Sequence, residues 1–270
     1  MTCLIVRHPL ACVTPVGMPV RAQGTRLLQV RPTPAFMDLL DDAAFLSLEH
    51  QLHLADVLGE HSWQVNLQTR SFTFDTEHGS VECTDFHFLG TAAPGPGSWL
   101  WSWANRSGFP ESVATLAASV REFGIEHGIG ELSAPELPFA SLPFDEPEPY
   151  QVAAVQTEAA KAVTGHWTGY QGPAGDDGTR AAFLVEHPDF RLPPAEGPRI
   201  MRTLSEGLSG LALHNHRRAL NSYLSLRGLN PAFAPDESRL VVDSPVLSGT
   251  IGFDEQGRAA SIEMTVPGAR

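Results

Sequence analysis

The pattern of apolar and polar positions along the chain predicts helices separated by short strands. Apolar residues recur at helical spacing in four segments that we expect to be helices. They are residues 38–59, a segment that opens at Pro110 and ends at Gly128 and Gly130, residues 150–164, and residues 198–227, which could be broken at Gly207 and Gly210. Strands are expected at residues 61–67, 70–76, 81–90, 98–104, 166–171, 180–186, 240–243, 248–253 and 260–266. The strands follow one another closely, which favours antiparallel pairing. This order predicts an α+β fold of antiparallel sheets with helices packed on one side, and helix–strands–helix order in both halves.

A row of tryptophans is the sharpest structural signal in the sequence. Trp99, Trp101 and Trp103 stand at alternate positions, so one strand would place all three indoles on the same face. They could form a core layer, since tryptophan buries a large apolar area. They could also form a platform or pocket for a small ligand, with Asn105 and Arg106 as its nearest polar groups. The sequence leaves both interpretations open.

The same run carries a family resemblance. Residues 97–105, which read GSWLWSWAN, resemble the hallmark of an uncharacterised family of bacterial proteins, a domain of unknown function. Gln51, the strand around Trp63 and the helix after Pro110 fit the same pattern, and the resemblance covers about residues 38–190. It implies a mixed α and β fold. The family has no known activity, so the resemblance assigns no catalytic residue.

Proline content divides the chain. Residues 1–36 contain five prolines, four arginines and no acidic residue, and we expect them to be a loosely ordered tail. Met37 directly precedes the first helical pattern, so this tail could reflect a start codon assigned too early. Residues 131–149 contain five further prolines and form the best boundary between an acidic part, residues 37–149, and a second part, residues 150–270. The two parts could still share one core.

Charge and cysteine content limit the possible partners and the location. The 270 residues carry a net charge of −13, and residues 37–150 alone contribute −15. Such a charge repels phosphate backbones, and no apolar run approaches the roughly 20 residues of a membrane helix, so we expect neither a nucleic-acid nor a membrane partner. The acidic region could serve solubility, or it could bind a basic protein partner. Three dispersed cysteines indicate a reducing, cytoplasmic location.

A polar stripe on the first predicted helix is the best catalytic candidate. The helix is apolar around most of its circumference, which predicts burial. Glu49, His53 and Asp56 lie within about 60° of one another on its polar side. Such a group could transfer a proton or bind a divalent ion, although a solvated polar face or a buried structural network would give the same pattern.

Recognisable enzyme motifs do not occur in the sequence. It lacks G-x-S-x-G, G-x-x-x-x-G-K, H-E-x-x-H and C-x-x-C motifs, and the eleven histidines have no ligand spacing. We therefore predict no metal site and no cofactor. The leading expectation is a binding or interaction module with an acidic surface. The alternatives are a small-molecule-binding protein with a Trp-lined pocket, or an enzyme that uses the stripe of Glu49, His53 and Asp56.

Overall fold

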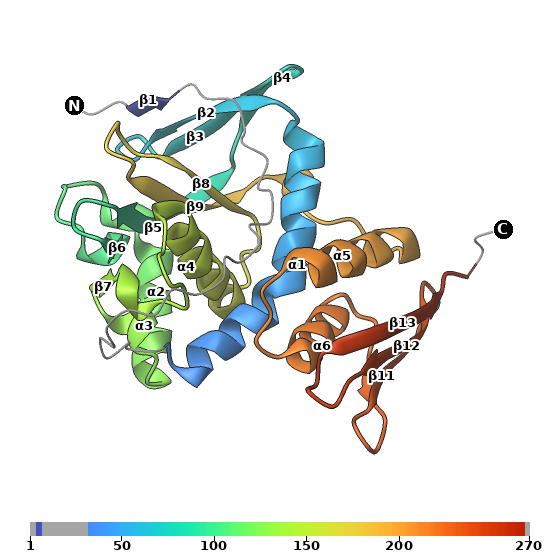
Figure 1. The fold of residues 1–270 in the computed structure, drawn as a ribbon. Helices are drawn as coiled ribbons and strands as arrows, with labels where there is room; N and C mark the ends of the chain where they lie inside the picture. Colours follow the sequence, from blue (N-terminus) through green and yellow to red (C-terminus); the bar gives the residue numbers. More distant parts are fainter. Residues whose placement is uncertain (1–3, 7–31, 268–270) are drawn as a thin grey trace.

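The computed structural model describes residues 4–6 and 32–267. These residues form six α-helices and three antiparallel sheets, which confirms the predicted α+β fold (Figure 1). The helices are α1 (Pro34–Leu58), α2 (Thr115–Glu126), α3 (Gly130–Ser133), α4 (Pro149–Thr164), α5 (Gly197–Gly210) and α6 (His216–Leu226).

The first sheet has the order β1 (Leu4–Val6), β2 (His61–Asn66), β3 (Ser71–Thr76), β4 (Gly79–Glu82). The second has the order β7 (Glu136–Pro138), β6 (Ser98–Trp101), β5 (Asp85–Ala93), β9 (Arg180–Glu186), β8 (Gly169–Pro173). The third has the order β10 (Ala232–Phe233), β11 (Arg239–Asp243), β12 (Ser248–Phe253), β13 (Ala259–Thr265).

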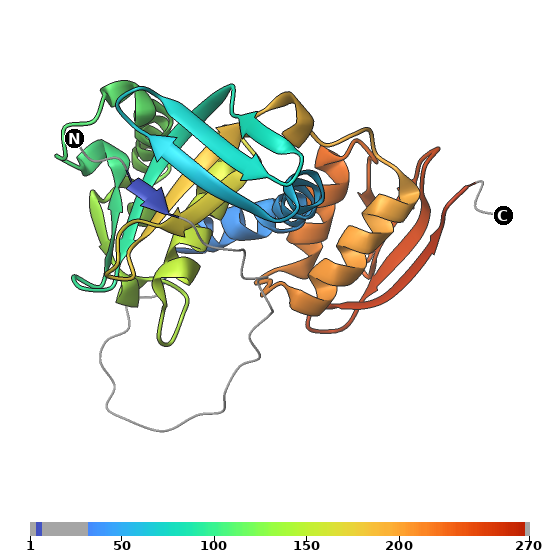
Figure 2. The same ribbon diagram turned by 90° about the horizontal axis from the view of Figure 1, so that it is seen from above.

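The long helix α1 connects all parts of the molecule (Figures 1 and 2). Because it is apolar on nearly every side, different turns of the helix enter different hydrophobic clusters. Phe36 packs beneath the second sheet, Phe45 packs against α5, α6 and the third sheet, and Leu54 packs between the first two sheets. The sequence expectation that this helix is largely buried is confirmed by these positions.

Helix α1 begins before Met37, within the segment that the sequence predicts to be an N-terminal tail. The helix begins at Pro34, and the Thr33 hydroxyl accepts a hydrogen bond from the Phe36 amide as an N-cap. Phe36 is fully buried, so residues 33–36 belong to the folded protein. Residues 4–6 pair with β2 as a fourth strand of the first sheet. The expected loose order of residues 7–31 lies outside the described residues.

The first two sheets and their helices form three layers. Aromatic side chains of β2 and β3 pack on one face of β5 and β9, and the rings of Trp63 and Phe183 lie 5.9 Å apart between the two sheets. The opposite face of the second sheet is covered by α2 and α4 (Figure 1). Strand β5 precedes the proline-rich residues 131–149 in the sequence, and strand β9 follows them. The two strands pair directly with each other, so the parts of the chain before and after that stretch share one core.

The third sheet belongs to a separate cluster beside this sandwich. Its inward side chains, such as Leu240 and Ile251, pack against α5 and α6, while those helices pack against α1 (Figure 2). The predicted helix over residues 198–227 is interrupted at residues 211–215, directly after Gly210, and its two parts are α5 and α6. Gly207, the other expected break, lies inside α5. None of the helices in the described residues is long and apolar enough to cross a membrane.

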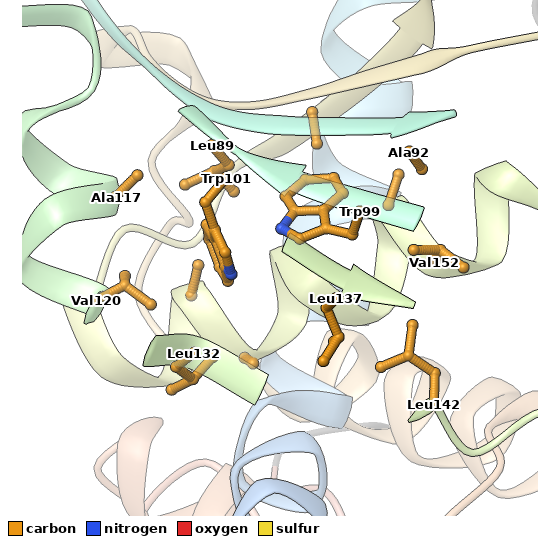
Figure 3. Packing of buried hydrophobic residues seen from close by; sticks show 14 of the residues in the cluster. Leu89, Ala92, Trp99, Trp101, Ala117, Val120, Leu132, Leu137, Leu142 and Val152 are labelled. Carbon is orange, nitrogen blue, oxygen red and sulfur yellow. The ribbon is translucent and has the colours of Figure 1, made fainter. Parts of the chain in front are cut away.

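The tryptophan row is only partly a strand. Trp99 and Trp101 project from β6 into the core, where both are fully buried and their rings lie 5.3 Å apart at right angles (Figure 3). The predicted strand over residues 98–104 ends at Trp101, because residues 102–104 form a 3₁₀ turn closed by a hydrogen bond from the Asn105 amide to the Ser102 carbonyl. Trp103 therefore lies outside the strand, although it packs against the same hydrophobic cluster as Trp99 and Trp101.

Candidate metal centre

Glu49, the first residue of the predicted polar stripe, is part of a buried network. Its carboxylate is 1% exposed, forms an ion pair of 3.0 Å with Arg227 and accepts a hydrogen bond of 3.1 Å from the Tyr223 hydroxyl. Burial raises the pKa of Glu49, against the opposing effects of Arg227 and Tyr223. This network connects α1 to α6, which is the buried structural arrangement that the sequence left open.

The other two stripe residues have separate partners. The Nε2 atom of His53 lies 3.0 Å from the Asp189 backbone carbonyl, and the carboxylate of Asp56 lies 3.6 Å from the Arg202 guanidinium. The structure records no hydrogen bond among Glu49, His53 and Asp56, although all three lie in the described residues. The three residues do share one face of α1. Each of them, however, contacts a different segment: Glu49 contacts α6, His53 contacts the segment before α5, and Asp56 contacts α5.

The tryptophan row and the polar residues after it differ in burial and in their contacts. Trp99 and Trp101 are fully buried, as the core interpretation predicts, whereas Trp103 is partly exposed and has the guanidinium of Arg121 4.9 Å above its ring. The Asn105 side chain accepts a hydrogen bond from the Ser107 amide and stabilises the turn. Arg106 is exposed.

A different group of residues forms the strongest candidate site. His87, His166 and Glu186 bring two imidazoles and one carboxylate together, and one ligand atom from each lies within 4.8 Å of the other two. The Nε2 atoms of His87 and His166 lie 3.3 Å and 3.0 Å from the same carboxylate oxygen, Oε1 of Glu186. The two rings stand nearly perpendicular, 5.1 Å apart.

The central strands of the second sheet position two of these three residues. His87 lies opposite Leu184 in the pairing of β5 with β9, and Glu186 is the last residue of β9. The backbone carbonyl of Glu186 accepts hydrogen bonds from both the amide and the hydroxyl of Thr84, at 2.8 Å and 3.0 Å. Side chains alternate along strands, so His87 and Glu186 project on the face that α4 covers. The fold thus fixes their backbones before any ligand binds.

The end of α4 positions the third residue. Gly165 caps the helix in the left-handed conformation, with φ of 70°, and reverses the chain toward the sheet. The next residue, His166, has its Nδ1 atom 3.2 Å from the Thr164 carbonyl. A carbonyl only accepts, so Nδ1 carries the proton in this contact. In a neutral imidazole, Nε2 is then left with a lone pair, and it is Nε2 that faces Glu186.

The arrangement fits the geometry of a transition-metal site. A metal ion about 2.0–2.1 Å from nitrogen and oxygen ligands in a tetrahedral site separates those ligands by roughly 3.3–3.4 Å. The two His–Glu distances of 3.3 Å and 3.0 Å are close to that value. The hydrogen bond of His166 to a backbone carbonyl is the contact that commonly orients a metal-binding histidine. Small movements of the imidazoles would therefore complete the site.

Exposure differs across the three side chains. His87 is 13% exposed and its Nδ1 atom is buried with no hydrogen-bond partner among the described residues, whereas His166 and Glu186 are 34% and 42% exposed. The cluster is thus least exposed at His87 and most open to solvent at the other two residues. An ion could enter from that side.

Sequence spacing gave no indication of this cluster. Its members are separated by 79 and 20 positions, and the sequence predicts His166 and Glu186 only as the ends of strands. The missing information was the pairing of β5 with β9, since that pairing brings residue 87 next to residue 186. The expectation that the chain has no metal site rested on spacing alone.

Comparison with known proteins identifies a family and no activity. Residues 37–188 match the model of a family of unknown function, DUF6882. No curated protein and no solved structure matches the chain. The family match includes His87, His166 and Glu186 and ends before α5. Because the match covers more than half of the chain, the protein belongs to this family.

Proposed function

We propose that this member of the DUF6882 family binds a divalent transition-metal ion through His87, His166 and Glu186. The observation that supports the proposal most strongly is the convergence of two imidazole Nε2 atoms on one carboxylate oxygen, at 3.3 Å and 3.0 Å. All three ligands lie within the family region, and two of them are on the central pair of strands.

The position of the His166 proton is the physical reason to expect a cation. With Nδ1–H bonded to the Thr164 carbonyl, a neutral His166 directs a lone pair at the negative oxygen of Glu186. Two acceptors in contact repel each other unless a cation lies between them. A metal ion bound to both atoms satisfies the contact, and so does a second proton on His166. A metal titration separates these two possibilities.

The donor set indicates which ions are suitable. Imidazole nitrogen suits zinc, iron, nickel, cobalt and copper, whereas calcium and magnesium prefer sites built from oxygen ligands. Two histidines and one carboxylate also match the ligands of known catalytic zinc sites. We therefore expect Zn²⁺ or Co²⁺ to bind, and Ca²⁺ and Mg²⁺ to bind far more weakly.

The test is a metal titration of the full chain. Protein freed of metal with a chelator is titrated with Zn²⁺ in competition with a chromophoric chelator, and bound metal is counted by mass spectrometry. We expect one ion per chain, and an affinity at least about 10-fold lower in His166→Gln and Glu186→Gln. His78→Gln is the matched control, because His78 is exposed in the turn between β3 and β4.

The outcomes show whether a metal ion or a proton lies between His166 and Glu186. Equal Zn²⁺ affinity in the wild type, His166→Gln and Glu186→Gln would overturn the proposal and leave a protonated His–Glu ion pair. Circular dichroism and thermal melting of each variant show whether a loss of affinity comes from unfolding. His166→Gln is the safer variant, since His166 lies in a partly exposed loop.

A second proposal concerns binding of a basic protein partner by the acidic part of the chain. Most acidic residues between 37 and 150 are exposed, although Asp41, Glu49 and Glu131 are buried with internal partners. Glu122 and Glu126 are both exposed at the end of α2. The test is capture of partners from host lysate at low and high salt. A partner that is lost at high salt and in the double variant Glu122→Gln with Glu126→Gln supports the proposal, and a partner held equally in every condition contradicts it.

A cytoplasmic location is proposed on the basis of cysteine content. Cys83, the cysteine within the described residues, is a free thiol, and burial raises its pKa to about 12, so it is poorly reactive. Fractionation of host cells with an antibody to the chain tests this proposal. Recovery in the soluble cytoplasmic fraction supports it, and recovery outside the cytoplasm contradicts it.

A further inference from the structure

We infer that the metal ion at His87, His166 and Glu186 keeps an open coordination position that binds a carboxylate-type oxygen anion. This inference rests on the proposed function, because it concerns the ligands that the protein does not supply. It specifies the chemical class of molecule that the site would recognise. Three features of the site support it: the number of protein ligands, the direction of exposure and the local charge.

The number of protein ligands leaves the coordination shell incomplete. Among the described residues, no fourth histidine, cysteine, aspartate or glutamate joins the cluster at the same spacing. Zinc and similar ions take four or more ligands, and closed structural sites usually obtain all four from the protein. An ion held by three protein ligands therefore binds at least one ligand from solution.

The direction of exposure places this open position toward solvent. His87, at 13% exposure, is the least exposed member of the cluster, while His166 and Glu186, at 34% and 42%, form its open rim. The face of an ion that does not contact the protein would lie on the same side as the exposed rim. A small molecule could reach it from that side, because His166 and Glu186 are the more exposed members of the cluster.

The local charge favours a single negative charge in that position. Two neutral imidazoles and one carboxylate reduce the charge of a divalent ion to about +1. The neighbouring carboxylate of Asp85, opposite Glu186 in the strand pairing, is already paired with Arg70 at 2.7 Å. The bound ion is thus left with one positive charge to balance. A monoanionic oxygen donor, such as a carboxylate or a hydroxamate, balances it and binds in the exposed position.

Cobalt substitution tests the inference directly. Chelator-treated full-length protein is loaded with one equivalent of Co²⁺, whose visible absorption reports coordination number and ligand type. Acetohydroxamate is then added as the probe. We expect a saturable change in the cobalt absorption bands, with a single dissociation constant that is unaffected in His78→Gln. Simple acetate should produce a weaker change of the same kind, because it forms a weaker chelate.

The possible failures are distinguishable. If Co²⁺ does not bind, or binds equally well to His166→Gln, the proposed metal site itself is wrong. If Co²⁺ binds at one equivalent and depends on His166, but its spectrum does not respond to acetohydroxamate, the site is closed and the present inference is overturned. If acetohydroxamate removes Co²⁺ from the protein, the spectrum becomes that of the free complex, and this result also contradicts the inference.

Discussion

The partly buried His50 of α1 should make the protein sensitive to mild acid. His50 stacks on Trp167, with ring centroids 6.5 Å apart, and its Nδ1 atom lies 3.3 Å from the Thr168 hydroxyl. Burial, followed by the nearby positive charge of Lys161, lowers the pKa of His50 from 6.5 to about 3. In the folded protein His50 therefore stays neutral at pH values where the unfolded chain binds a proton.

The size of the effect follows from this pKa. Because the folded pKa is lowered, the stabilising contribution is complete above pH 6.5 and is lost as the pH falls from 6.5 toward 3. At about 1.4 kcal/mol per unit, the free energy of unfolding should fall by about 2 kcal/mol between pH 7 and pH 5 through His50 alone. Other groups also titrate in this range, so the comparison must isolate His50.

The assay compares the wild type with His50→Phe, which keeps an aromatic ring against Trp167 but cannot bind a proton. Urea unfolding is followed at pH 7, 6 and 5 in the presence of a chelator, so that metal binding does not contribute. We expect the wild type to lose about 2 kcal/mol more than the variant over this interval. Parallel loss in the two proteins would show that folding does not lower the pKa of His50, and the predicted acid sensitivity would be wrong.

Two further predictions concern the parts of α1 that contact distant segments. Phe36→Ala should lower the free energy of unfolding by about 3–5 kcal/mol, because Phe36 is fully buried. The control Ile125→Ala, at a position 54% exposed, should change it by less than about 1 kcal/mol in the same urea assay. Equal effects of the two substitutions would place Phe36 outside the core. Asp41→Ala should cost about 1–3 kcal/mol in urea unfolding, because its two carboxylate oxygens accept hydrogen bonds from the backbone amides of His214 and Asn215 at 2.9 Å and 2.8 Å. Asp38→Ala, at a partly exposed residue, is the control, and an equal cost in both variants would contradict this assignment.

Local sequence pattern was sufficient to predict most of the secondary structure. The helix over residues 38–59 could be expected because its apolar residues lie on every side, and in the structure it contacts three hydrophobic clusters. Hairpins such as β2 with β3 were predictable because their strands are adjacent in sequence and alternate in polarity. These features depend on near neighbours in the chain.

The errors lie where tertiary contacts decide the local structure. The segment at residues 98–104 has a tryptophan at every second position, as a strand with one apolar face would. In the structure, a hydrogen bond from the Asn105 amide to the Ser102 carbonyl closes a turn after Trp101. β7 forms within the proline-rich stretch because it is an edge strand, where a proline is tolerated. Periodicity contains no information about either contact.

The candidate site could not be predicted from sequence for the same reason. His87 and Glu186 are 99 positions apart and meet through the pairing of β5 with β9, while His166 reaches them from the end of α4. The stripe of Glu49, His53 and Asp56 could be predicted, because helical periodicity alone puts these three residues on one face of the helix. In the structure each of its members has a separate partner instead.

The most direct test of the metal centre is a crystal of the full chain soaked with Zn²⁺, with diffraction data collected on both sides of the zinc absorption edge. We expect one strong anomalous peak, about 2.0–2.2 Å from Nε2 of His87, Nε2 of His166 and a carboxylate oxygen of Glu186. Anomalous peaks confined to other residues, with the His166 and Glu186 side chains still in direct contact, would contradict it.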